Sequence, residues 1–200
     1  PAICGVLPRA TGQVHMMDLG ANVECSANLL FQFGVMATIM VRYLDGIEKP
    51  SIGLLNIGIE NIKGNETIKE ASELFRNSKL NYQGFVEGDS IFTGNVDIIV
   101  CDGFSGNVAL KTSEGLAQML TRITREAFGR NWYSRVVGGL AFPALKSIFR
   151  RIDHRRYNGA ALLGLRGAVI KSHGSADRVA FGHAIEVARR AINTDLVRHI

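Results

Sequence analysis

Several apolar stretches of this 200-residue sequence end in short polar turns, and these turns hold the side chains that could do chemistry. The most informative turn follows residues 96–101, a β-branched and aliphatic run that is typical of a central parallel strand. Its small and polar residues are Asp102, Gly103, Ser105, Gly106 and Asn107. The glycines allow a sharp turn, and Ser105 or Asn107 could cap a following helix whose first amides would face an anion. The turn therefore predicts an anion site, with an ordinary strand-to-helix loop as the alternative.

Similar turns follow other predicted strands. Gly20 and Asn22 follow a short predicted strand at residues 14–19, and His173 follows residues 168–171. Residues 51–57 lead into a third such turn, which contains Lys63, Gly64 and Asn65. Because ligands of open α/β sheets bind at the carboxyl ends of the strands, we expect Lys63 to project over the same crevice as Asn107. A solvated loop lysine is the alternative.

The elements that would position these turns alternate between strand and helix. This order predicts an α/β fold with a mostly parallel sheet and helices on both faces, and the length favours a single domain over residues 1–200. Residues 27–44 are apolar nearly all round, so we expect a helix buried in the core or in a subunit interface. The helix after Gly106 has an apolar stripe that we expect to pack on the sheet, formed by Leu116, Met119, Leu120, Ile123 and Ala127.

Residues 129–156 differ in composition from the rest of the chain, with seven Lys/Arg and one acidic residue among large apolar side chains. Pro143 and the pair Gly138 and Gly139 predict two short helices. A basic amphipathic hairpin of this kind suits an anchor in an anionic membrane surface, and burial against its own domain or a sister subunit is the alternative. Nucleic-acid binding is weaker, because no recognised motif accompanies the arginines. The predicted membrane-binding residues are Trp132, Leu140, Phe142, Leu145, Ile148 and Phe149.

Charge and cysteine content bound the environment. Residues 1–100 contain 7 Lys/Arg and 11 Asp/Glu, whereas residues 101–200 contain 16 and 7, so the basic half requires an acidic partner or surface. Cys4, Cys25 and Cys101 lack metal-binding spacing and fit a reducing cytoplasm. We find no signal peptide and no run of about 18 apolar residues. The chain begins with Pro1 and reads as a part of a longer protein.

Ordered motifs along almost the whole chain resemble the PlsX family of bacterial phosphate acyltransferases. They lie at residues 18–23, 54–58, 63–66, 102–108, 110–112, 157–160 and 169–174. The resemblance implies a fold similar to phosphotransacetylases and isocitrate-type dehydrogenases, and formation of acyl phosphate from acyl-[acyl carrier protein] and inorganic phosphate in phospholipid synthesis. It implies a homodimer at the cytoplasmic face of the cell membrane, without metal, nucleotide cofactor or nucleic acid, and catalytic roles for Lys63 and Asn107. The family's amino-terminal third has no counterpart here.

The chemistry implied by the resemblance requires no protein nucleophile, because phosphate supplies its own oxyanion. We expect the amides near Gly106 and the Lys63 ammonium to hold phosphate or the oxyanion while Asn107 orients the thioester. His173 is either a general acid–base group or a structural imidazole, and Cys101 is an inert core cysteine rather than an acyl acceptor. The alternatives are a soluble acyl-CoA phosphotransferase of the phosphotransacetylase kind and a noncatalytic membrane-surface scaffold.

Overall fold

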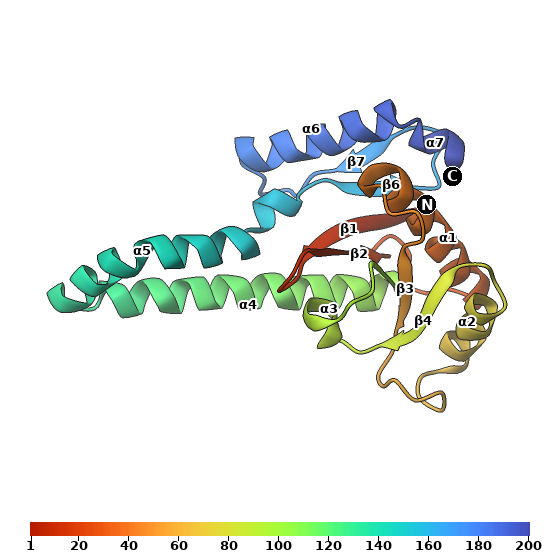
Figure 1. The fold of residues 1–200 in the computed structure, drawn as a ribbon, viewed down its shortest axis with the longest axis horizontal. Coiled ribbons are helices and arrows are strands. Elements are labelled where there is room, and N and C mark those ends of the chain that lie inside the picture. Colours follow the sequence, from red (N-terminus) through yellow and green to blue (C-terminus); the bar gives the residue numbers. More distant parts are fainter.

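The strands lie side by side in the order β4, β3, β5, β2, β1, β6 and β7 in a computed structural model of the protein (Figure 1). The structure describes residues 1–200, except for the side chains of Ile148, Arg151, Ile152 and His154. The strands are β1 (Ala2–Pro8), β2 (Gln13–Met17), β3 (Ser51–Leu55), β4 (Asn81–Val86), β5 (Ile98–Val100), β6 (Ala160–Leu163) and β7 (Val169–Lys171). The helices are α1 (Ala27–Asp45), α2 (Glu66–Arg76), α3 (Ser90–Thr93), α4 (Gly103–Gly129), α5 (Trp132–Ile152), η1 (His154–Tyr157), α6 (Arg178–Asn193) and α7 (Leu196–His199).

The sheet is mixed, which corrects the expectation of a mostly parallel sheet. β2, β5, β3 and β4 pair in parallel, whereas β1 pairs antiparallel with both β2 and β6, and β6 pairs antiparallel with β7. Short connections link β1 to β2 and β6 to β7, and such connections permit antiparallel pairing without a crossover helix. Only the part of the sheet that contains β2 to β5 follows the predicted strand–helix alternation.

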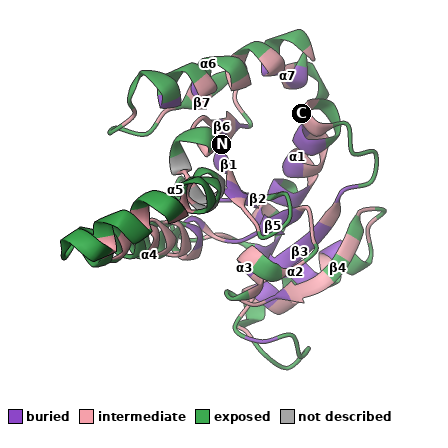
Figure 2. Ribbon diagram, turned by 60° about the vertical axis from the view of Figure 1, so that its left-hand side comes forward, coloured by how far each residue is buried: buried purple, intermediate pink, exposed green. Residues whose placement is uncertain are grey.

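The α/β part of the chain buries two apolar layers, one on each face of the sheet. Side chains alternate across each strand, so Ile98 and Val100 face the layer of α1 and α2 while Ile99 faces the opposite layer. As predicted, α1 lies in the core, with Leu30, Phe33 and other side chains of its apolar face buried (Figure 2). Among the described residues, α1 is the helix long and apolar enough to cross a membrane, but core packing requires the same composition.

The long helices α4 and α5 form a hairpin that projects beyond the sheet (Figure 1). Of α4, only the start packs on the sheet layer, through Ala109 and Leu110. The predicted packing of the later stripe on the sheet is therefore wrong: Leu116 and Ile123, for example, are 51% and 52% exposed. A 27-residue helix is about 40 Å long, which exceeds the short strand β5 that it follows.

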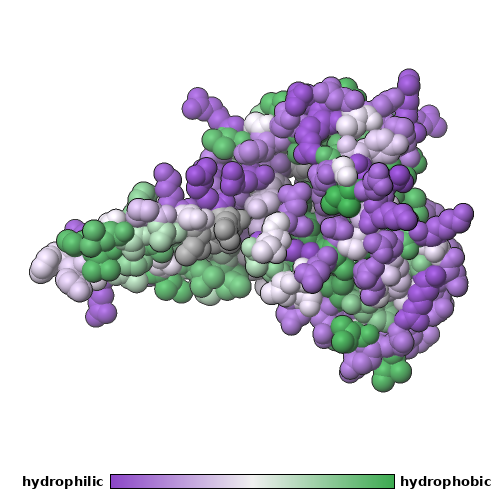
Figure 3. All heavy atoms as spheres, viewed as in Figure 1, coloured by the Kyte–Doolittle hydropathy of each residue, from purple (hydrophilic) through white to green (hydrophobic). Residues whose placement is uncertain are grey.

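α5 is one helix with Pro143 inside it, so the prediction of two short helices is also wrong. Gly138 has a packing role instead: a Cβ there would lie 2.9 Å from Phe128 Cδ1 of α4, so glycine lets the two helices approach closely. The hairpin therefore includes α4 as well as residues 129–156. Apolar side chains gather along its surface (Figure 3).

Candidate active site

The turn after β2 and the start of α4 are in direct contact, and this contact unites most of the predicted site residues. The Gly103 amide donates to the Asn22 carbonyl oxygen at 2.7 Å. A Cβ at Gly106 would lie 1.9 Å from the Asp18 carbonyl oxygen, so only glycine fits there. A Cβ at Gly20, whose φ is +123°, would lie 3.4 Å from Asn107 Cβ. The carboxyl ends of β2 and β5 thus meet, as the sequence predicted.

Three of the amides that the sequence offered for anion binding, those of Gly103, Ser105 and Gly106, already have partners within the chain. Asp102, rather than Ser105 or Asn107, caps α4, which begins at Gly103. The Asp102 carboxylate accepts bonds from the Ser105 amide at 2.7 Å and the Ser105 hydroxyl at 2.9 Å. The Gly106 amide donates to the Asp102 carbonyl oxygen at 3.0 Å. An internal carboxylate therefore lies at the positive end of the helix, and phosphate bound by amides near Gly106 would have to compete with it.

Asp18 organises the neighbouring turn and was not a predicted site residue. Its carboxylate is fully buried and accepts bonds from the Ile3 amide at 2.9 Å and the Asn22 amide at 2.7 Å. The Gly20 and Ala21 amides also donate to it, each at 3.1 Å. An aspartate between a strand and a glycine is the sequence signal that could have identified this role. Asp18 holds Gly20 and Asn22 against α4.

We predict that Asp18→Asn destabilises the fold by about 3 kcal/mol or more, because an amide nitrogen would replace one oxygen of a buried acceptor surrounded by donors. The measurement is urea unfolding followed by circular dichroism. Asp89→Asn is the matched control, since Asp89 is exposed and makes no side-chain cap bond to α3. Equal stability losses in the two variants would contradict the structural role of the Asp18 carboxylate.

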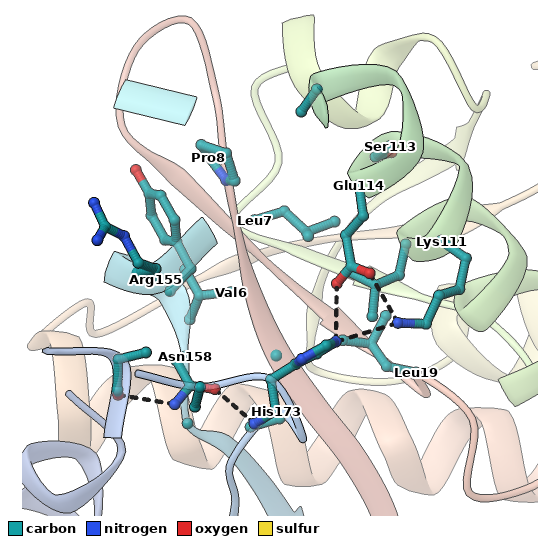
Figure 4. A pocket seen from close by; sticks show the side chains of 18 of the residues that line it. Val6, Leu7, Pro8, Leu19, Lys111, Ser113, Glu114, Arg155, Asn158 and His173 are labelled. Atoms are coloured by element: carbon teal, nitrogen blue, oxygen red, sulfur yellow. Dashed lines mark hydrogen bonds and ion pairs between the residues drawn. The ribbon is translucent and has the colours of Figure 1, made fainter. Parts of the chain in front are cut away.

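A cavity of about 940 Å³ opens beside Asn107, between α4 and β1 (Figure 4). Its walls are largely aliphatic, and α5, the residues before β6 and the start of α6 complete them. The α4 side of the wall consists of Asn107, Leu110, Lys111, Ser113, Glu114, Leu116, Ala117 and Leu120. The predicted site residues Asn107 and His173 both line this cavity.

A polar cluster lies along the cavity wall near Asn107. Lys111 Nζ lies 2.8 Å from Glu114 Oε2 and 3.4 Å from His173 Nε2 (Figure 4). The opposite ring nitrogen, His173 Nδ1, lies 2.8 Å from the Ser175 hydroxyl, and the His173 amide donates to Asn158 Oδ1 at 2.8 Å. Asn107 and Lys111 are one helical turn apart, so an ammonium and a carboxamide share one face of α4. Lys111 was not a predicted site residue, although the sequence shows it four residues after Asn107, the spacing that puts two side chains on one helix face.

Lys63 lies on the loop between β3 and α2 and is exposed. Asn65 caps α2 by accepting a bond from the Ile68 amide at 2.9 Å, and the Asn56 amide group donates to the Lys63 carbonyl oxygen at 3.2 Å. Gly64 adopts φ +87° within this loop. β3 is parallel to β5, so Lys63 and Asn107 follow the same edge of the sheet. Among the described residues, however, Asn107 lines the cavity and Lys63 does not.

The thiol of Cys101 is buried, and burial raises its pKa well above the ordinary value. It therefore stays protonated, which agrees with the interpretation of an inert core cysteine. Within the described part of the chain, no group of three or more His, Cys, Asp and Glu side chains could hold a metal ion. The cavity lining at this edge includes an amide, ammonium groups and an imidazole, from Asn107, Lys111, Lys171 and His173.

The fold is similar to that of a solved phosphotransacylase. A crystal structure of a branched-chain phosphotransacylase from Enterococcus faecalis V583 superposes on 96% of this chain and 66% of its own, with a TM-score of 0.58 and 15% sequence identity. Residues 1–199 match the family model described as fatty acid synthesis protein, and the chain belongs to that family.

Proteins with similar sequences are named phosphate acyltransferase. The protein from Paraburkholderia phytofirmans is 56% identical over 200 residues, which are 100% of this chain and 54% of that protein. The protein from Nitrosococcus oceani is 54% identical over 200 residues, covering 59% of its length. The chain thus spans little more than half the length of the curated relatives it matches.

Proposed function

We propose that this chain forms part of a phosphate acyltransferase that makes acyl phosphate from long-chain acyl-[acyl carrier protein] and inorganic phosphate. The names of its relatives support this reaction. The observation that carries the proposal is the position of Asn107, which lines an apolar cavity together with Lys111, one helical turn further along α4, and His173, whose Nε2 lies 3.4 Å from Lys111 Nζ. A long-chain thioester likewise has an apolar part, the acyl chain, on one side of its reacting carbonyl group.

In the proposed reaction, a phosphate oxygen attacks the thioester carbonyl carbon and the carbon–sulfur bond breaks. The released thiolate then takes a proton from solvent or from His173 to become a thiol. The Asn107 carboxamide donates to the developing oxyanion, and the ammonium groups of Lys63 and Lys111 offset the phosphate charge. Asp102, Gly103, Ser105 and Gly106 hold Asn107 in place through the contacts of the helix start. Gly20, Asn22, Gly64 and Asn65 shape the adjoining turns.

The test is phosphate-dependent release of thiol from palmitoyl-[acyl carrier protein] and palmitoyl-CoA. It uses the chain and a fusion that adds the portion of the P. phytofirmans relative outside the matched region. We expect release from the carrier-protein thioester, requiring phosphate and weakening with salt because the carrier protein is acidic and residues 101–200 are basic. Preference for the CoA thioester would favour the soluble acyl-CoA phosphotransferase. Release from neither thioester by either protein would contradict the proposal and favour the scaffold.

We also propose that the hairpin of α4 and α5 contacts the anionic cytoplasmic face of the cell membrane, in a homodimeric enzyme. Trp132, Leu140 and Phe142 support this location because they are 77%, 80% and 60% exposed, so the chain's own domain does not cover them. Arg130, Arg135 and Lys146 are also exposed on or beside α5 and would meet anionic headgroups. Leu145 and Phe149 are half-buried and contribute less than the sequence predicted, and the side chain of Ile148 lies outside the described residues.

We predict that the double substitution Leu140→Asp and Phe142→Asp lowers binding to phosphatidylglycerol vesicles at least tenfold, because two exposed apolar groups would be replaced by charges that anionic lipid repels. Vesicle flotation measures the bound fraction. Gln118→Asp on the exposed surface of α4 is the single-charge control and should change binding less than twofold. Undiminished flotation of the double variant, together with its dissociation to monomers in light scattering, would assign these residues to a subunit interface instead.

A further inference from the structure

We propose that the cavity along α4 binds the acyl chain of the substrate, with the carbonyl end at Asn107 and the methyl end toward Leu120. This inference rests on the proposed function and assigns the acyl chain a specific place in the molecule. The cavity is continuous with the polar cluster of Lys111 and His173, so a chain that enters it begins beside the groups that would act on its head.

The shape of the cavity fits an extended chain. Its α4 residues recur along one helix face from Asn107 to Leu120, which are thirteen residues apart and therefore separated by about 20 Å along the axis. The opposite wall is the strand β1, and α5 contributes Ala144 and Ser147. At about 940 Å³, the cavity lies at the upper end of the ~300–1,000 Å³ that is usual for ligand sites.

Two ion pairs neutralise four of the six Asp, Glu, Lys and Arg side chains in the wall, and the remaining two, Arg9 and Lys171, are basic. Lys111 is paired with Glu114 at 2.8 Å. Arg155 is paired with Asp177 at 3.1 Å. Neither pair lies on the α4 face beyond Glu114, where the lining residues are Leu116, Ala117 and Leu120. A nucleotide or sugar would find few polar partners there, whereas a hydrocarbon chain needs none.

Ala117 occupies a position that could limit chain length. It lies ten residues after Asn107, or about 15 Å along α4, and its small side chain leaves the cavity open toward Leu120. A phenylalanine at this position would occupy the cavity at that depth. Long chains would then be obstructed, while short chains that end before Ala117 would still fit.

The experiment measures how well octanoate and palmitate each displace a fluorescent fatty acid that is bound to the protein. In Ala117→Phe we expect palmitate affinity to fall at least tenfold and octanoate affinity to stay within twofold. Ala127→Phe is the matched control on the same helix, because Ala127 is exposed and outside the cavity lining, and it should leave both affinities within twofold. Leu120→Asn, at the far end of the cavity, is a second variant that should selectively weaken palmitate if Ala117→Phe does not fold.

The outcomes separate this inference from the proposed function. Absence of palmitate binding by the unsubstituted chain, or identical profiles for Ala117→Phe, Leu120→Asn and Ala127→Phe, would overturn the acyl-chain site. Thiol release by the fusion is measured with octanoyl- and palmitoyl-[acyl carrier protein] in parallel, and selective loss of the palmitoyl reaction in Ala117→Phe would support the site. Selective palmitate binding without thiol release from any thioester would support the site and contradict the proposed acyl transfer.

Discussion

Asn107→Ala is expected to lower phosphate-dependent thiol release about a hundredfold or more, the usual effect of removing one oxyanion donor, which corresponds to about 3 kcal/mol in the barrier. The structural reason is the location of Asn107 on the first turns of α4, against Gly20 and at the wall of the cavity. Steady-state rates with palmitoyl-[acyl carrier protein] give the effect in the fusion, or in the chain if it is active alone. Because the side chain is exposed, the variant should fold normally.

Asn95→Ala is the control for this prediction, because Asn95 is an exposed loop residue outside the cavity lining and its replacement should leave the rate within twofold. A rate for Asn107→Ala within threefold of the unsubstituted protein would refute the assigned role. Lys63→Ala and Lys111→Ala, assayed beside it, distinguish the two ammonium groups. A large loss confined to Lys111→Ala would remove Lys63 from the reaction and place the anion at the cavity.

Gly106→Ala is expected to have the largest effect on folding. The added Cβ would lie 1.9 Å from the Asp18 carbonyl oxygen and 2.8 Å from Cys101 Sγ, and the backbone atom cannot move without separating the β2 turn from α4. We expect a loss of about 3 kcal/mol or more in the free energy of unfolding, at or above the upper end for an overpacked site. Urea unfolding monitored by circular dichroism measures it.

Gly115→Ala provides the matched control, since Gly115 lies on the same helix and its added Cβ would meet nothing within 4 Å. Alanine favours a helix over glycine, so this variant should gain about 0.5–1 kcal/mol. The two substitutions are chemically identical and differ in sign because of the neighbour alone. Equal stabilities would show that the β2 turn does not press on α4 as the structure has it.

The most accurate predictions were those that depended only on residues close together in the sequence. The apolar face of α1 is buried as expected, because helical periodicity is a local property. The β5 strand was recognised for the same reason, although the cap of the helix after it is Asp102 and not Ser105 or Asn107. The extent of α4 was not recognised, because an apolar stripe does not indicate whether a sheet, another helix or a ligand faces it.

The sequence by itself determined the strands β2, β3 and β5, the buried first helix, and the motifs that indicated the family, but not β1, which lines the cavity. Only the tertiary structure decided that the Asp18 carboxylate accepts the Ile3 amide as well as the amides of its own turn, and that Lys111 and His173 join Asn107 at a cavity. The physical reason is that a hydrogen-bond donor is available to a ligand only if no nearer acceptor has taken it. At Asp18 the competing donors include the Ile3 amide, which is fifteen residues away in the sequence and is brought to Asp18 by the pairing of β1 with β2.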